Sequence, residues 1–171
     1  MKIEIKSIYG NVLFEYDCES NSMLKTLLKA IEERAYLRNA DLRNANLRNA
    51  DLSSANFNEN TAMFLLACPK EGSFIAWKKA SNKIVKLLVT ENAKRSSATS
   101  LKCRCSEAKV LEIQELDRTT CDLLEIKSSY DSSFIYKLSE TISVDDFDED
   151  RWNECSTGIH FFLSRELAVK Y

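Results

Sequence analysis

A polar basic segment, residues 94–104, carries the side chains that best suit a bound ligand. Its cations and hydroxyls are Arg95, Ser96, Lys102 and Arg104, with Lys94 and Ser97 beside them. A guanidinium offers forked donors and a serine hydroxyl a short one, a combination that suits phosphate or another anion. The segment therefore predicts a loop that contacts a small anionic, nucleotide-like ligand or a protein partner. The alternative interpretation is a solvated basic loop that pairs with the acidic stretch at 145–150.

A second candidate is the pair formed by Cys155 and His160, which is the only histidine of the chain. A cysteine becomes a nucleophile when an imidazole lies within hydrogen-bond reach of its thiol. This pair would indicate an unfamiliar enzyme, a transferase or hydrolase that acts on a nucleotide. The alternation of residues 159–163, however, places His160 on one face of a strand with Phe162, which is typical of a structural histidine. Catalysis is therefore kept as the alternative.

A zinc site is the weaker alternative for Cys103, Cys105, Cys155 and His160, because three thiolates and an imidazole form a legitimate ligand set. The Cys-x-Cys spacing is not that of the usual zinc knuckle, and no Cys-x-x-Cys occurs. Free cysteines are also common core residues. The acidic stretch lacks the spacing and the glycine of an EF-hand. We predict neither a metal nor a cofactor.

Composition and missing motifs favour a non-enzymatic binding module over a standard hydrolase, kinase or dehydrogenase. No P-loop, GxGxxG, HExxH or Ser-His-Asp grouping appears. A net charge of −2 and a pI near 5.6 argue against broad binding of nucleic acid. No apolar run approaches the length of about eighteen residues that a membrane span needs. Six cysteines without an export segment predict reduced thiols in a cytoplasm.

The element that must organise the N-terminal part is a five-residue repeat, read as AYLRN, ADLRN, ANLRN, ADLSS and ANF over residues 35–57. A step of five residues rotates a side chain by about 140° around a helix, and it moves a side chain to the opposite face of a strand. Neither a helix nor a strand can therefore bring the repeated residues to one face. The period instead predicts a square β-solenoid that turns a corner every five residues. Its interior would hold the large apolar residues Leu37, Leu42, Leu47, Leu52 and Phe57.

These pentapeptides resemble the pentapeptide-repeat family, whose motif is A(D/N)LXX. The resemblance implies a right-handed quadrilateral β-helix. Five pentapeptides make little more than one coil, whereas solenoids need about three repeats to bury a continuous core. We therefore expect a platform between other elements. Its outward row, Arg38, Arg43 and Arg48, is positive, which argues against DNA mimicry. Homodimer assembly through the solenoid end, with Phe57 in the contact, is a third hypothesis.

Flanking elements follow from local patterns. Residues 1–16 alternate about the turn at Gly10, which predicts a β-hairpin. Asn21 or Ser22 can cap a helix over residues 23–34 that covers the solenoid edge. Trp77 and Trp152 are each expected in a core, with a place in a pocket wall as the alternative. Further strands are predicted at 74–79, 84–89, 108–116, 123–126, 134–138, 141–144 and 159–163, with a short helix over 164–168. The predicted fold is mainly β (α+β), with domains at 1–60 and 61–171.

The second domain resembles the uncharacterised C-terminal domain of phage and bacterial pentapeptide-repeat proteins. The similarity is carried by FIAWKK, AKRSSAT, KCRCSEAKVLEI and VDDFDEDRWNECSTGIHFF. It implies a phage or prophage gene and the cytoplasm of a bacterial host cell, and it implies no established activity. The combined prediction is a non-enzymatic module that engages a host protein or a small anionic ligand.

Overall fold

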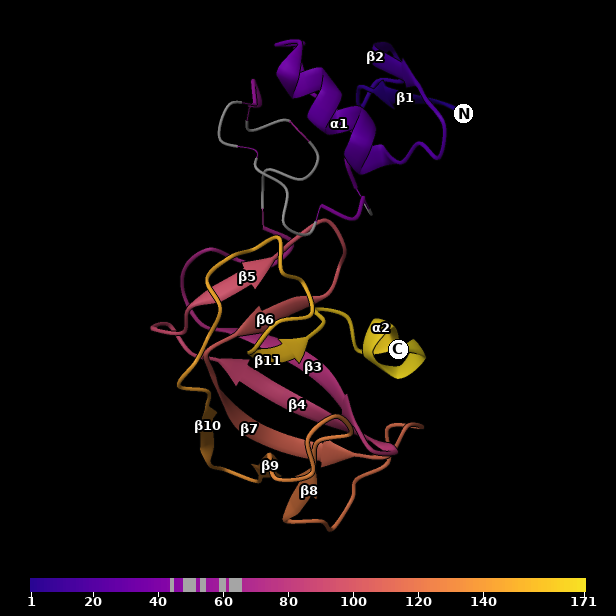
Figure 1. The fold of residues 1–171 in the computed structure, drawn as a ribbon. Coiled ribbons are helices and arrows are strands. Elements are labelled where there is room, and N and C mark those ends of the chain that lie inside the picture. The colour runs from indigo at the N-terminus through magenta and orange to yellow at the C-terminus, as the bar shows by residue number, and fades with distance from the viewer. Residues whose placement is uncertain (44, 48–51, 53–54, 59–60, 62–65) are drawn as a thin grey trace. The chain divides into compact units, whose positions relative to one another are not determined.

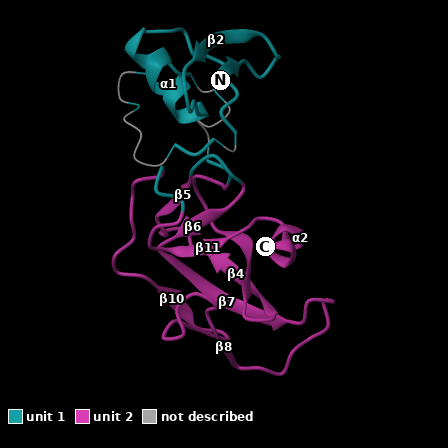
Figure 2. Ribbon diagram, turned by 45° about the vertical axis from the view of Figure 1, so that its right-hand side comes forward, with its two compact units in different colours: residues 1–67, 98–100, 152–154 teal, residues 68–97, 101–151, 155–171 magenta. Residues whose placement is uncertain are grey.

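The computed structural model describes residues 1–43, 45–47, 52, 55–58, 61 and 66–171. These residues divide into two compact units, shown in different colours in Figure 2. Unit 1 contains residues 1–67, 98–100 and 152–154, and unit 2 contains residues 68–97, 101–151 and 155–171. Residues 98–100 and 152–154 thus belong to the N-terminal unit, whereas the predicted division into 1–60 and 61–171 placed them in the second domain.

Unit 1 opens with the predicted hairpin and helix. Strands β1 (Lys2–Lys6) and β2 (Val12–Asp17) pair antiparallel, and α1 spans Met23–Glu32 (Figure 1). The Ser22 hydroxyl accepts a hydrogen bond from the Lys25 amide at 3.1 Å, which is the N-cap that the sequence predicts. The helix ends earlier than predicted because Arg34 takes a left-handed conformation with φ of 56°.

The repeat contributes inward-facing leucines to the core of unit 1. Leu37, Leu42 and Leu47 are buried, while Leu52 and Phe57 pack against the same cluster and are partly buried. This burial is compatible with the predicted solenoid interior, which stays a prediction. Residues 48–51 and 53–54 lie outside the described residues, so the complete coil stays a prediction.

Two sets of hydrogen bonds in unit 1 bear on that coil. Tyr36 and Asn56 form a parallel β-bridge, and they occupy equivalent positions in the first and fifth pentapeptides. This is the pairing that one four-sided turn would produce. The end of the hairpin also reaches the repeat, because the Asp41 amide donates to the Lys6 carbonyl at 2.7 Å. The hairpin as well as α1 therefore contacts the repeat, and Leu27 of α1 shares its core.

Unit 2 is built on a four-stranded antiparallel sheet with the order β10-β7-β4-β3 (Figure 1). Its strands are β3 (Phe74–Ala80), β4 (Lys83–Val89), β7 (Glu107–Gln114) and β10 (Thr141–Ser143). Most apolar residues of the central strands are buried, among them Ile84, Val85 and Leu87 of β4. The helix α2 (Arg165–Lys170) packs on β3, where the Lys79 ammonium donates to the Val169 carbonyl at 3.1 Å.

A second sheet has the order β11-β6-β5, formed by β5 (Arg95–Ser97), β6 (Cys103–Cys105) and β11 (Ile159–Phe161). Trp77 and Phe162 exchange two backbone hydrogen bonds of 2.8 Å, which join β3 to the residue after β11. Strands β8 (Glu125–Lys127) and β9 (Ile135–Lys137) form a separate two-stranded ribbon. The predicted β-rich C-terminal region is confirmed. Part of the segment predicted as a basic loop forms strands, since β5 and the first residues of β6 lie within residues 94–104.

Among the described residues, no helix has both the length and the apolar character needed to cross a bilayer.

Candidate ligand-binding site

Strand register brings together three of the residues singled out by sequence. Ser96 of β5 pairs with Arg104 of β6, and Arg104 pairs with His160 of β11. Directly opposed residues of an antiparallel pair lie on one face of the sheet. Ser96, Arg104 and His160 therefore form a row across the second sheet. Cys103 and Cys105 alternate with Arg104, so their side chains lie on the other face, where both are buried.

Arg104 is committed to the fold. Its side chain is only 2% exposed, and it donates to the carbonyls of Asp148, of Asp150 at 2.6 Å and of Thr157 at 3.1 Å. Its guanidinium carbon lies 5.0 Å from the centroid of the Phe147 ring. Burial lowers the pKa of Arg104, and the charges of Asp148 and Asp150 oppose this shift. Arg104 thus holds the acidic stretch in place, as in the alternative interpretation, through hydrogen bonds to backbone carbonyls.

A close approach at Gly158 shows how tightly this loop lies against Arg104. A Cβ at position 158 would lie 3.2 Å from the Arg104 Cβ and 3.2 Å from the Phe147 ring. The φ of Gly158 is 144°, a backbone conformation that residues with an L side chain rarely adopt. Both observations require glycine at this point of the loop.

Arg95 likewise serves the fold. Its guanidinium donates to five backbone carbonyls, those of Pro69, Gly72, Thr90, Glu91 and Ala93. The group also lies over the Phe74 ring at 5.2 Å from the centroid. The predicted role of Arg95 as a free donor to an anion therefore differs from the structure, which uses its donors to fasten two turns. Ser96 is buried beside it, at 3% exposure.

Lys102 and Cys155 meet in unit 2. The Lys102 ammonium lies 3.1 Å from the Cys155 sulfur and 5.7 Å from the centroid of the Tyr171 ring. Cys155 is exposed, whereas Lys102 is buried. The predicted partner of Cys155 was His160, which instead belongs to the row on β11 described above. Within the described part of the chain, no group of three or more His, Cys, Asp and Glu side chains is placed to hold a metal ion, so the zinc alternative does not assemble.

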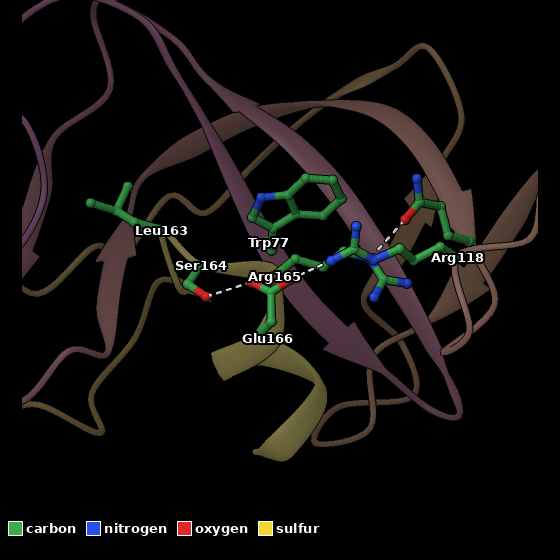
Figure 3. A pocket seen from close by; sticks show the side chains of 7 residues that line it. Trp77, Arg118, Leu163, Ser164, Arg165 and Glu166 are labelled. Atoms are coloured by element: carbon green, nitrogen blue, oxygen red, sulfur yellow. Dashed lines mark hydrogen bonds and ion pairs between the residues drawn. The ribbon is translucent and has the colours of Figure 1, made fainter.

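A cavity of about 370 Å³ opens elsewhere on unit 2, between the end of β7 and the start of α2 (Figure 3). Its lining residues are Trp77, Gln114, Arg118, Leu163, Ser164, Arg165 and Glu166. Figure 3 shows the Trp77 ring between Leu163 and Arg118. A pocket wall was the alternative for Trp77, and the residue takes that place. Trp152 packs against the core of unit 1, as expected for that residue.

Arg165 builds the floor of this cavity. Its Nε donates to the Gln114 side-chain oxygen at 3.0 Å, and its terminal nitrogens donate to the carbonyls of Glu115 at 2.8 Å and Leu116 at 3.2 Å. These bonds fasten the first turn of α2 to the end of β7. The Ser164 hydroxyl caps α2 by accepting from the Leu167 amide at 3.4 Å. The lining is therefore held by side chains that contact one another.

Arg118 and Glu166 form the polar wall. A terminal nitrogen of Arg118 lies 2.5 Å from a Glu166 carboxylate oxygen, and the other carboxylate oxygen accepts from the Ser164 hydroxyl at 2.9 Å. The pKa of Glu166 is lowered by a hydrogen bond from its own backbone amide, by the Ser164 hydroxyl and by Arg118. The carboxylate therefore stays ionised near neutral pH. Arg118 has a φ of 77°, a conformation that suits the turn after β7 and directs this arginine to the rim.

The cavity thus combines a flat aromatic face with an accessible guanidinium that a carboxylate orients. Sequence reasoning did not single out Arg118, Arg165 or Glu166. Arg118 follows a turn and Glu166 opens a short helix, and neither position carries a recognisable motif. The acidic residue that follows the Ser164 cap is the one feature of the sequence that could have drawn attention to Glu166. Acidic residues are common in the first turn of ordinary helices, so this feature does not indicate a binding site.

Comparison with known proteins agrees with both resemblances. The pentapeptide repeats (8 copies) model matches residues 33–59, and the model of a family of unknown function, DUF5758, matches residues 64–168. No curated protein and no solved structure matches the chain. All residues that line the cavity fall within the second match. Because that match spans more than half of its length, the chain belongs to the DUF5758 family of unknown function and carries pentapeptide repeats ahead of the family's domain.

Proposed function

We propose that this chain is a non-enzymatic binding module that holds a small anionic, nucleotide-like ligand in the cavity beside Trp77. The observation that carries the proposal is the placement of the Trp77 ring and the Arg118 guanidinium on the walls of one cavity. Its volume of about 370 Å³ lies within the range of small-molecule sites. The chemistry of these two walls indicates which class of ligand fits the cavity.

Trp77 supplies a surface for a planar group. Its ring is partly buried, and the Lys86 ammonium lies 5.7 Å from the centroid of that ring. A base that stacks on an aromatic side chain gains about 1–3 kcal/mol, and the gain depends little on which base it is. A nucleobase therefore fits this wall.

Arg118 supplies the contact for a negative charge. Its side chain is 66% exposed, and its hydrogen bond to Glu166 uses one of the five N–H groups of a guanidinium. A phosphate can accept from the remaining N–H groups while Glu166 holds the side chain in position. Arg165 is less available, since its donors already reach Gln114 and two carbonyls.

The proposed contact surface lies at the cavity and not at the basic segment 94–104. Arg95 and Arg104 were expected to meet the anion, but both donate to carbonyls of unit 2. Removing either group from those carbonyls to bind a ligand would leave buried acceptors without donors, which costs about 1–3 kcal/mol for each. Arg118 avoids that cost because it lies at the surface.

Fluorescence titration tests the proposal. In a Trp152→Phe background, Trp77 is the remaining tryptophan, so its emission reports on the cavity. We expect a saturable change with adenosine monophosphate and a weaker response with adenosine, which lacks the phosphate. Arg118→Gln should weaken binding of the monophosphate by at least about tenfold, because a charge-assisted hydrogen bond contributes about 1.5–3 kcal/mol.

The matched control is Arg43→Gln. Arg43 forms an ion pair with Asp41 in unit 1, and its side chain is 65% exposed, close to the 66% of Arg118. Both substitutions remove one exposed guanidinium and one ion pair. A titration without a saturable change, or equal weakening by the two substitutions, would contradict a site at the cavity.

A further inference from the structure

We propose that Cys155 and Lys102 form a site of acyl modification, at which the Cys155 thiolate accepts an acyl group from a small thioester and passes it to the Lys102 amine. The final product is an amide on Lys102. Neither residue lines the cavity beside Trp77. The inference therefore goes beyond the proposed binding function and does not depend on it.

The two nucleophiles are in direct contact. The Lys102 ammonium donates a hydrogen bond to the Cys155 sulfur at 3.1 Å. The carbonyl carbon of an acyl group on that sulfur is one bond away from the sulfur, so it would lie beside the Lys102 nitrogen. Reacting atoms held at about 3–3.5 Å are in a near-attack arrangement, which replaces a high concentration of a free reactant. The geometry therefore suits transfer from sulfur to nitrogen.

The second sheet brings these two side chains together from distant parts of the chain. Lys102 directly precedes β6, and Cys155 lies in the segment that leads to β11. Strands β6 and β11 pair antiparallel. Arg104 also holds the segment before β11, because its guanidinium donates to the Thr157 carbonyl at 3.1 Å. The contact therefore joins two backbone positions that the pairing of β6 and β11 keeps close.

The two side chains differ in accessibility, which assigns the order of the steps. Cys155 is exposed, whereas Lys102 is only 9% exposed. A thioester in solution can reach the sulfur, while burial hinders its direct reaction with the lysine. The thiolate is the nucleophilic form of a cysteine, and the Lys102 ammonium is placed to donate to it. Cys155 is therefore the first acceptor of the acyl group, and Lys102 is the second.

An aromatic pair beside the lysine favours a small apolar acyl group. The Lys102 ammonium lies 5.7 Å from the centroid of the Tyr171 ring, and the Tyr171 and Phe162 ring centroids are 5.2 Å apart. Acylation removes the charge of the ammonium and its cation–π contact. A methyl or short alkyl group can then pack against the rings, whereas an acyl group with a second carboxylate would bury a charge.

The chemistry proceeds in two balanced steps. The Cys155 thiolate attacks the thioester carbonyl carbon, the bond from that carbon to the leaving sulfur breaks, and the leaving thiolate takes a proton from the Lys102 ammonium. The neutral Lys102 amine then attacks the same carbon, its bond to the Cys155 sulfur breaks, and that sulfur takes the proton lost by the nitrogen. The products are the amide on Lys102, the free Cys155 thiol and the free thiol of the donor.

The experiment incubates the full-length chain with S-acetyl-N-acetylcysteamine and follows the acetylated peptides by mass spectrometry. This thioester carries no nucleotide, so the reaction does not require binding at the cavity. Acetylation of Lys102 should be at least about tenfold slower in Cys155→Ser and in Cys155→Ala than in the natural chain. Lys94, whose side chain is 60% exposed, should be acetylated at the same rate in all three chains. In Lys102→Arg, the acetyl group should stay on Cys155 as a thioester that neutral hydroxylamine cleaves.

The matched control is Cys121→Ser, which removes a half-buried thiol of unit 2 and should leave the acetylation of Lys102 unchanged. Circular dichroism identifies the variants that are folded. The proposal is wrong if Lys102 of the folded natural chain gains no acetyl group, or if its acetylation is as fast without the Cys155 thiol as without the Cys121 thiol. Loss of nucleotide binding at the cavity would leave this result untouched, because Trp77 and Arg118 take no part in it.

Discussion

The buried guanidinium of Arg104 donates to the carbonyl of Asp150 at 2.6 Å, which joins strand β6 to an acidic loop more than forty residues later in the chain. The same guanidinium reaches Asp148 and Thr157. One side chain therefore fastens the loop that covers this face of the second sheet, and its removal should have a large effect.

Arg104→Met should lower the free energy of unfolding by about 3 kcal/mol. The substitution leaves carbonyl groups of the loop without their donor, and each unsatisfied buried group costs about 1–3 kcal/mol. Urea denaturation monitored by circular dichroism measures the change. Lys94→Met is the control, since its ion pair with Glu149 is exposed and such pairs contribute about 0–1 kcal/mol. Similar losses of unfolding free energy for both variants would show that the buried hydrogen bonds of Arg104 contribute no more to stability than an exposed ion pair.

Lys78→Met should raise the free energy of unfolding at pH 7 by about 1 kcal/mol, a common gain for a stabilising change. Burial, followed by the charge of Lys102, lowers the pKa of Lys78 in the folded chain below its ordinary value of 10.5. Between the two pKa values the unfolded chain binds the proton more strongly, so the stability of the natural chain rises with pH there. At pH values below the pKa of Lys78 in the folded chain, the full cost of burying the charged ammonium lowers the stability.

Urea denaturation of both chains at several pH values from 7 to 10 measures this effect. The stability difference between Lys78→Met and the natural chain should shrink as the pH rises toward 10.5. Lys109→Met replaces an exposed lysine of β7 and should show no such trend. A difference independent of pH would mean that Lys78 acts through packing alone.

Leu37→Ala should destabilise unit 1 by about 2–5 kcal/mol, the range for a fully buried leucine. Leu37 has no exposed surface and packs in the core shared with α1. Tyr36→Ala is the matched control in the same pentapeptide, because Tyr36 is 60% exposed. Thermal unfolding followed by circular dichroism compares the two. Equal destabilisation would argue against an inward and an outward face of the repeat.

Several elements could be predicted because their signals are local. The Ser22 cap, the alternation of the first hairpin and the five-residue period with its inward Leu37, Leu42 and Leu47 all depend on neighbouring residues. The strands of the second domain were largely predicted for the same reason. The segment at 94–104 was predicted as a loop because its serines and cations resemble solvated residues, whereas in the structure β5 pairs with β6 and β6 with β11, and Ser96, Ser97 and Arg104 are buried.

The sequence by itself determined the repeat, the β-rich second domain and the chemical types available for a site. The tertiary structure decided what each arginine does. Arg104 is enclosed by β11 and the acidic loop, whereas a turn leaves Arg118 at the rim of the cavity. The acceptors of Arg104 are backbone carbonyls, which every residue carries, so no pattern of side chains can mark them in advance.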